Sequence, residues 1–286
     1  MSRFPVNVPY HVAVRRSRLL RLAYRARLPR IVARSISCPR TLGFQVYSFS
    51  GESELPEQVA SIRSFLRHAG APARFTVVSD GTHTSEAIEL LERLHRVVEV
   101  RPLGGIVRTD LPPEVMSYAT DHPLGKKLSM LLSLEVSAPT IYVDSDILFF
   151  EGASDLADGR YLSGENYYLP DCRPSLDEAL IDDVRTLETP VNSGFLILNR
   201  ALDWTDALAR LRHAPSPAGF FTEQTVVHLA LHADGGLPLD PNSYVVGVQD
   251  QFRFRDGYTR TRPALRHYTR PVRYRLWSNL RPAGAW

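Results

Sequence analysis

The chain is poor in the residues that build small disulfide-linked proteins and membrane spans. Its 286 residues include only two cysteines, Cys38 and Cys172, which allow at most one disulfide. Neither cysteine belongs to a metal-binding spacing, and we expect both to be reduced thiols in a cytoplasmic protein. No apolar run reaches the roughly 18 residues that a membrane-spanning helix needs. With 44% hydrophobic and 23% charged residues, the composition instead predicts an ordinary globular protein.

Several common enzyme signatures are also missing. The sequence contains no Gly-x-Gly-x-x-Gly, no Gly-x-x-x-x-Gly-Lys and no Gly-x-Ser-x-Gly. These absences exclude the dinucleotide-binding, P-loop and serine-hydrolase classes, whose chemistry depends on those turns. The chain also has no internal repeat and no low-complexity segment.

Acidic residues are missing from the beginning of the chain. Residues 1–40 contain ten arginines and no Asp, Glu or Lys. The whole chain carries a formal net charge of +3, so the remaining 246 residues carry −7. A protein that binds nucleic acid shows a basic face on its body, whereas this body is acidic. The charge distribution argues against nucleic acid as a partner and marks residues 1–40 as a basic N-terminal arm.

The arm contains a segment with helical periodicity at residues 14–28, and Pro29 is expected to end the helix. Its apolar residues share one helical face, namely Leu19, Leu22, Ala23 and Ala26. One interpretation is a peripheral anchor at the inner face of the membrane, where each arginine near anionic lipid contributes about 1 kcal/mol. The other is a solvated or loosely docked tail, and the sequence leaves both open.

From residue 41 onward, segments typical of strands alternate with segments typical of helices. Strands are predicted at 41–49, 74–79, 97–100 and 140–143. Helices are predicted between them at 58–68, 85–94 and 125–134. This alternation predicts an α/β fold with a mostly parallel central sheet and flanking helices. No linker interrupts residues 41–286, which we expect to form a single domain.

The second half is less regular. It is predicted to contain a strand at 191–199, a helix at 223–231 and short strands at 244–248 and 265–268. The acidic segment 171–188 lacks a clear period and is predicted to be a loop with one short helix. It is interpreted either as a lid over a ligand or as a plain solvated loop.

Asp144 and Asp146 follow the apolar strand at 140–143 and are the only Asp-x-Asp pair in the sequence. In extended backbone, side chains at i and i+2 point to the same side, so both carboxylates can reach one cation. Open α/β sheets bind ligands at the carboxyl ends of their strands. Paired carboxylates suit Mg²⁺ or Mn²⁺, which also hold a substrate diphosphate. The alternative is a strand-end turn with solvated carboxylates.

Two later segments place polar residues at the start of predicted elements. Asn192 can donate to a sugar hydroxyl, and Gly194 permits a close approach of backbone at the same strand. Glu223 lies in the first turn of a helix for which Thr222 is the expected N-cap. The helix dipole alone would explain an acidic residue there.

His267 lies near the C-terminus, with Arg270 and Arg273 three and six residues later. A single histidine is more often structural than a metal ligand. At this spacing from two arginines, however, His267 can complete a site for a metal and a diphosphate, because arginine makes paired contacts to phosphate oxygens.

These segments, in this order, resemble the GT-A glycosyltransferases, and the likeness is closest to retaining family 8, the glycogenin and lipopolysaccharide galactosyltransferase group. The resemblance covers about residues 41–277 and implies that residues 41–286 form one GT-A-like catalytic domain. The sequence departs from the family's pattern in three places. Glu223 stands where Asp is usual, and Arg270 stands where Gly is usual. Arg273-Tyr274-Arg275 stands where Lys-Pro-Trp is usual, with Trp277 displaced.

The resemblance implies a role for each motif. The first strand, with Tyr47 and Ser48, would hold the nucleotide base. The metal ligands would be Asp144, Asp146 and His267, with Asp144 also near the donor ribose. Lys127 and Arg273 would bind the donor diphosphate. The residues at the reacting face of the sugar would be Asn192, Glu223 and Gln224.

The function implied by the resemblance is a metal-dependent hexosyltransferase. It would use Mn²⁺ or Mg²⁺ and move a sugar from a nucleotide-diphosphate sugar, with a UDP-sugar favoured, to an acceptor hydroxyl with retention. The acceptor would be a glycan, a lipid or a small molecule. A nucleotidyltransferase is disfavoured because residues 50–54, after the first strand, are acidic. A non-catalytic carbohydrate- or membrane-binding module with the same fold remains an alternative.

Overall fold

The computed structural model describes residues 7–162, 164–181, 189–253 and 255–286. Its α-helices are α1 (Val8–Ala26), α2 (Leu28–Val32), α3 (Leu55–His68), α4 (Ser85–Glu92), α5 (Pro113–Asp121), α6 (Pro123–Leu132), α7 (Thr205–Arg212) and α8 (Thr222–Ala233). Its strands are β1 (Gln45–Ser50), β2 (Arg74–Ser79), β3 (Val98–Pro102), β4 (Thr140–Val143), β5 (Ile147–Phe149), β6 (Tyr167–Pro170), β7 (Val191–Leu198), β8 (Leu237–Pro238), β9 (Tyr244–Val245) and β10 (Leu265–His267). The 3-10 helices that matter below are η1 (Glu52–Glu54) and η6 (Arg273–Ser278).

The main sheet has seven strands in the order β3-β2-β1-β4-β7-β6-β8. Strands β1 to β4 pair in parallel, whereas β7 runs antiparallel to both β4 and β6. All four residues of β4 are buried, which agrees with its apolar sequence and its place in the middle of the sheet. The predicted α/β fold with a mostly parallel central sheet is therefore confirmed.

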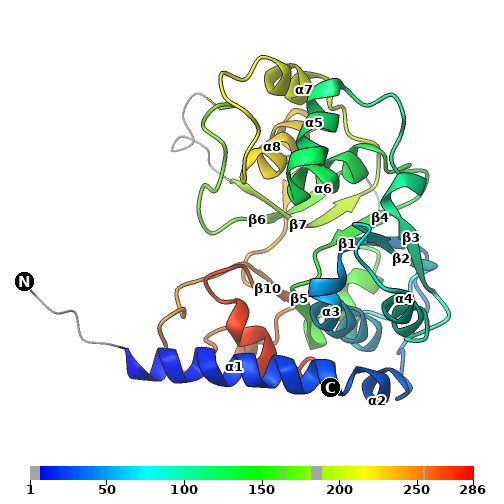
Figure 1. Cartoon of the computed structure of the whole chain (residues 1–286), viewed down its shortest axis with the longest axis vertical. Helices are drawn as coiled ribbons and strands as arrows, with labels where there is room; N and C mark the ends of the chain where they lie inside the picture. The colour runs from blue at the N-terminus through cyan, green and yellow to red at the C-terminus, as the bar shows by residue number, and fades with distance from the viewer. Residues whose placement is uncertain (1–6, 163, 182–188, 254) are drawn as a thin grey trace, which may run out of the picture.

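Helices cover both faces of this sheet. Because successive residues of a strand point to opposite faces, neighbouring residues of β4 contact different helical layers. Ile141 and Val143 pack in one core cluster with α3 and α4, while Tyr142 packs in the other with α6 and α8. Figure 1 shows α5 to α8 on one side of the strands and α1 to α4 on the other. The carboxyl ends of β1 and β4 lie at the edge between these two layers.

A second sheet brings a strand from near the C-terminus next to the aspartate pair. Its three strands have the order β5-β10-β9, and β10 runs antiparallel to β5 with His267 opposite Ile147. The sequence predicts a short strand at 265–268 but does not predict that it pairs with β5. This pairing places the histidine directly beside Asp146.

Local predictions fail at several helices. Helices α2, α5 and α7 are not predicted, because each has at most nine residues and is too short to show a clear apolar period. The expected N-cap of α8 is wrong: Phe221 precedes the helix, and Thr222 is its first residue. The Thr222 hydroxyl donates instead to the carboxylate of Asp177, so a tertiary contact replaces the local cap.

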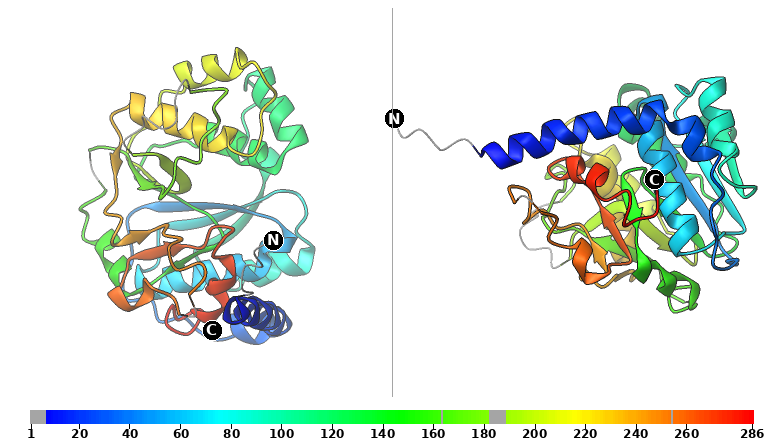
Figure 2. Two further views of the ribbon diagram at one scale, coloured as in Figure 1. Left: turned by 90° about the vertical axis from the view of Figure 1, so that its left-hand side faces the viewer. Right: turned by 90° about the horizontal axis from the view of Figure 1, so that it is seen from below.

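The described part of the basic arm, residues 7–40, packs against the rest of the molecule instead of forming a solvated tail. Helix α1 lies beside η6 and the C-terminal residues, as two views show (Figures 1 and 2). Tyr24 is fully buried between the rings of Trp277 and Trp286, and its hydroxyl donates to the Ala285 carbonyl at 2.7 Å. The helix spans Val8–Ala26 and not the predicted 14–28. A break near Pro29 is observed, but Pro29 lies in the first turn of the next helix, α2.

The opposite face of α1 is open to solvent. The apolar residues predicted to share this face include Leu19 and Leu22, which are 67% and 60% exposed. Within the part of the chain that the structure describes, no helix has both the length and the hydropathy to cross a membrane.

We expect Tyr24→Ala to lower the free energy of unfolding by about 3–5 kcal/mol, because it removes a buried aromatic ring from the core. The control is Leu22→Ala on the exposed face of the same helix, which should change stability by no more than about 0.5 kcal/mol. Denaturant unfolding of the full chain measures both. Equal, small effects would mean that the arm does not contribute to the core.

Candidate functional site

Two cavities open at the carboxyl ends of β1 and β4, and both are lined by Asp146 and Arg273. The larger has a volume of about 560 Å³ and lies on the side of α6, β7 and α8. The smaller has a volume of about 300 Å³ and lies on the side of α1 and α3. The two cavities therefore meet at an aspartate and an arginine that the sequence already marks.

The candidate metal site consists of Asp144, Asp146 and His267, whose ligand atoms all lie within 4.8 Å of one another. His267 Nε2 is 3.1 Å from Asp146 Oδ1 and 3.8 Å from Asp144 Oδ2. The expectation of extended backbone between the aspartates is wrong, because Ser145 and Asp146 form a turn between β4 and β5. The turn still directs both carboxylates to the same side.

Asn192 and Gly194 of β7 hold the histidine ring in place. His267 Nδ1 donates to Asn192 Oδ1 at 2.8 Å, which leaves Nε2 facing Asp146. This tautomer leaves the Nε2 lone pair available to a cation, and an outer partner of this kind is usual for histidines that bind metals. A Cβ at Gly194 would lie 2.4 Å from His267 Cε1, so only glycine leaves room for the ring.

Opposite charges balance at Asp146. Burial alone would raise the pKa of its carboxyl, but the neighbouring His267 and Arg273 outweigh burial and hold that pKa below its ordinary value. Burial also lowers the pKa of His267, yet the Asp146 carboxylate outweighs this effect and raises it above 6.5. The Arg273 guanidinium forms an ion pair with Asp146 from a side chain that is 52% exposed. Arg273 thus reaches Asp146 from the solvent side, where a ligand would enter.

Lys127 of α6 is buried among acceptors. Its Nζ lies 3.1 Å from Asp144 Oδ1 and 3.5 Å from Glu223 Oε1, and it donates to the Ser193 carbonyl at 3.2 Å. Burial lowers the pKa of Lys127, but the two carboxylates outweigh it and the net shift is upward. Burial raises the pKa of Glu223 despite Lys127. The lysine therefore carries a fixed positive charge beside the aspartate pair.

Gln224 follows Glu223 into the larger cavity. Its side-chain amide donates to the Ser175 carbonyl at 2.8 Å and to Asp171 Oδ2 at 3.3 Å. Asn192 also donates to Asp171 Oδ2, at 3.4 Å. Asp171 is thus a carboxylate of the cavity wall, held by two amides.

Two other carboxylates of the chain, Glu165 and Asp80, have partners away from this site. Glu165 pairs with Arg200. Asp80 accepts from the backbone and the hydroxyl of Thr82. Neither lines the two cavities at the strand ends.

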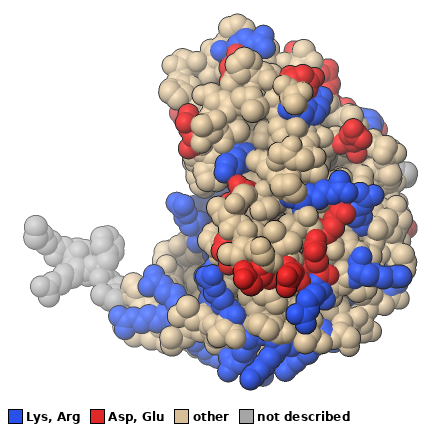
Figure 3. Space-filling view, turned by 45° about the vertical axis from the view of Figure 1, so that its right-hand side comes forward, with Lys and Arg blue, Asp and Glu red and all other residues tan. Residues whose placement is uncertain are grey.

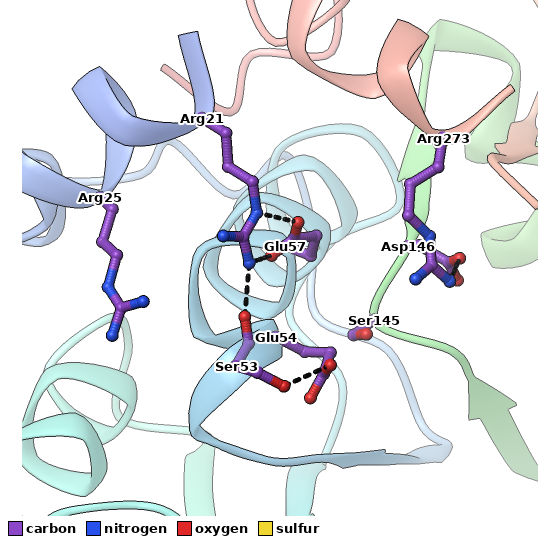
Figure 4. Close-up of a pocket in the computed structure, with 8 residues that line it drawn as sticks. All are labelled: Arg21, Arg25, Ser53, Glu54, Glu57, Ser145, Asp146 and Arg273. Atoms are coloured by element: carbon purple, nitrogen blue, oxygen red, sulfur yellow. Dashed lines mark hydrogen bonds and ion pairs between the residues drawn. The ribbon is translucent and has the colours of Figure 1, made fainter. Parts of the chain in front are cut away.

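The two residues expected to hold the nucleotide base do not line the cavities. Ser48 is fully buried and donates to Gln58 Oε1 at 2.8 Å. Tyr47 is half-buried and packs against the core cluster of α6 and α8. The smaller cavity is lined instead by residues that follow β1, together with two arginines of the arm (Figure 4).

Sequence reasoning missed the rim of the larger cavity. Phe220 and Phe221 are 54% and 43% exposed, and the Arg270 guanidinium lies 5.4 Å from the Phe220 ring centroid. The only indication of this rim in the sequence was Arg270, which stands where the resembling family usually has Gly. The acidic segment 171–188 reaches this cavity through Asp171 and Ser175, while its residues 182–188 lie outside the described residues.

Comparisons with solved structures find glycosyltransferases. LgtC, a galactosyltransferase solved in complex with donor and acceptor sugar analogues, matches 84% of this chain and 95% of its own, with 12% identity and a TM-score of 0.54. WbbM, a bifunctional glycosyltransferase, matches 82% of this chain and 47% of its own, with 12% identity and a TM-score of 0.53. Mouse xyloside xylosyltransferase 1 matches 82% of this chain and 99% of its own, with 17% identity and a TM-score of 0.50.

Neither protein-family models nor curated protein sequences give a match. The structural matches nevertheless extend over more than four fifths of the chain. The chain therefore has the GT-A fold of these glycosyltransferases.

Proposed function

We propose that this protein is a metal-dependent glycosyltransferase that moves a hexose from a nucleotide-diphosphate sugar to an acceptor hydroxyl. The observation that carries the proposal is the cluster of Asp144, Asp146 and His267 at the carboxyl end of a central parallel strand. Lys127 and Arg273 border the same point. A UDP-sugar is the favoured donor, on the family resemblance.

The residues present fit a divalent cation. Two carboxylates and one imidazole form a hard oxygen set with one nitrogen, which favours Mn²⁺ over Mg²⁺. Gly194 supports this fit, because its missing side chain gives His267 the space to face the aspartates. When bound, the cation would supply positive charge to the departing diphosphate.

The positively charged side chains of Lys127 and Arg273 would also stabilise the negative charge on the departing diphosphate. Lys127 is fixed by burial, so its charge would need no rearrangement when negative charge develops on the leaving group. Arg273 is half exposed, so it is free to contact a diphosphate as it enters. We assign both to binding and stabilising the diphosphate.

The reacting sugar would occupy the larger cavity beside Asn192, Glu223 and Gln224. Glu223 is engaged by Lys127 and by the Ser193 hydroxyl at 3.0 Å, which makes it a poor nucleophile. Gln224 is a weak nucleophile by chemistry and is assigned to positioning the sugar. Retention would then follow from attack of the acceptor hydroxyl on the leaving-group side. The aromatic rim would receive the acceptor, which is a glycan, a lipid or a small molecule.

Two rival functions are less well supported. A nucleotidyltransferase would need a basic loop after β1, whereas η1 there contains Glu52 and Glu54. A binding module with the same fold would need no buried lysine beside the metal ligands.

We also propose that the protein is cytoplasmic and binds the inner face of the membrane through α1. The exposed side of this helix carries large apolar residues flanked by arginines, and the arm contains no acidic residue. Figure 3 shows Lys and Arg side chains gathered along the lower edge, where Figure 1 places α1 and α2. An apolar stripe between cations suits a helix that lies in the interface of an anionic bilayer.

We expect Asp146→Asn to abolish sugar transfer and to remove the Mn²⁺-dependent thermal stabilisation by a nucleoside diphosphate. The amide keeps the size of the side chain but loses the charge that a cation needs. The control is Asp110→Asn, at a side chain that is 75% exposed and outside both cavities. Normal turnover in Asp146→Asn would refute the metal assignment.

We expect Gly194→Ala to weaken Mn²⁺ binding at least about tenfold, because the methyl group displaces His267 from the aspartates. Gly104→Ala serves as the matched control, since a Cβ there meets no atom within 4 Å. Titration calorimetry with Mn²⁺ compares both variants with the wild type. Unchanged affinity in Gly194→Ala would mean that His267 is not a ligand.

We expect the double change Leu19→Ser and Leu22→Ser to reduce partition onto vesicles of phosphatidylcholine with phosphatidylglycerol at least about tenfold. Turnover of a soluble acceptor should stay unchanged. Met116→Ser is the control, because Met116 is 46% exposed on α5, in the other helical layer. Vesicle sedimentation measures the partition, and equal binding by all three proteins would exclude α1 as the membrane contact.

A further inference from the structure

The smaller cavity lies at the topological switch point of the main sheet. From β1 the chain builds β2 and β3 on one side, and it then returns to place β4 on the other side of β1. Ligands of open α/β sheets bind in the crevice that this reversal leaves at the carboxyl ends of the strands. The cavity is lined by Ser53 and Glu54, which follow β1, and by Ser145 and Asp146, which follow β4.

The basic arm forms the remaining wall of this cavity. Figure 4 shows Arg21 and Arg25 entering from α1, while Asp146 and Arg273 stand at the opposite end. Arg21 makes a two-point ion pair with Glu57 of α3, with its Nε at 2.6 Å and its Nη2 at 2.9 Å from the carboxylate oxygens. Glu57 is buried, so this pair fixes α1 against the cavity.

Arg25 is held much more loosely. Its side chain is 46% exposed, and its ion pair with Glu52 spans 3.5 Å. Its guanidinium can therefore turn toward a ligand at little cost. Arginine offers several donors in one plane and also stacks on aromatic rings, which are the two contacts that a nucleobase accepts.

The charged residues at the two ends of the smaller cavity indicate which part of a donor each end suits. Around Arg21 and Arg25, the carboxylates of Glu54 and Glu57 balance the arginines, which suits an uncharged polar group such as a nucleoside. At the other end, Arg273 and the metal ligands face the larger cavity, which suits a diphosphate. A donor lying across Asp146 would place its sugar in the larger cavity and its nucleoside in the smaller one.

We propose that α1 of the arm forms one wall of the nucleoside subsite, with Arg25 contacting the base and Arg21 positioned by Glu57 beside it. This inference rests on the proposed function, since it assumes a nucleotide donor. It makes the arm part of the donor site as well as of the core. Ser53 and Glu54 supply a hydroxyl and a carboxylate for the ribose hydroxyls.

The test uses titration calorimetry of the full chain with Mn²⁺ and two kinds of probe. UDP, GDP, CDP and ADP extend into the smaller cavity, whereas inorganic pyrophosphate reaches only the shared end. The variants are Arg25→Ala and Arg21→Lys, the second of which retains a positive charge for Glu57. The control is Arg18→Ala, an exposed arginine of α1 that does not line the cavity.

We expect both cavity variants to bind the preferred nucleoside diphosphate about tenfold more weakly, as the loss of a charged hydrogen bond predicts. Their affinity for pyrophosphate, and every affinity of Arg18→Ala, should match the wild type. Thermal unfolding identifies any loss of fold in Arg21→Lys, and Arg25→Ala then decides the outcome alone.

Two results would overturn the inference and leave the proposed function standing. One is undiminished nucleoside diphosphate affinity in Arg25→Ala, and the other is an equal loss of pyrophosphate affinity in that variant. If none of the four nucleoside diphosphates binds the wild type, the proposed function fails, and this inference fails with it.

Discussion

Buried negative charge at the end of β4 is the constraint on which the site depends. Asp144, Asp146 and Glu223 lie close together, and burial of carboxylates is costly unless cations face them. Lys127 and His267 meet this need from α6 and β10. Each cation comes from a different element, so the helical layer, the main sheet and the second sheet must all be in place before the carboxylates are satisfied.

The second sheet makes this arrangement through ordinary backbone pairing. Strand β5 directly follows the aspartate turn, and β10 pairs with β5 in a register that places His267 opposite Ile147. Strand β7 then completes the site from the other side, because Asn192 accepts from the ring and Gly194 leaves space for it. The candidate metal ligands are thus positioned by strand β10 and by the turn between β4 and β5, and the half-exposed Arg273 is left to respond to a ligand.

Local sequence patterns predicted the fold class well, since each βαβ unit depends on neighbours in the chain. The strands at 74–79 and 140–143 were predicted with their observed bounds. The family resemblance also pointed to Lys127 and His267, whose side chains lie beside the aspartates. It did not predict that the Ser48 side chain faces the core and Gln58, because the choice between two faces of a strand is decided by packing.

What the sequence determined by itself is the alternation of elements, the aspartate pair at the end of an apolar strand, and a basic arm free of acidic residues. Only the tertiary structure decided which distant residues meet. His267 contacts Asp146 across 121 positions, and Tyr24 contacts Ala285 across 261. Such contacts depend on how whole elements pack and not on local propensity. For the same reason, the sequence marked the arm as basic, while packing made one of its faces a wall of the smaller cavity and left the other exposed.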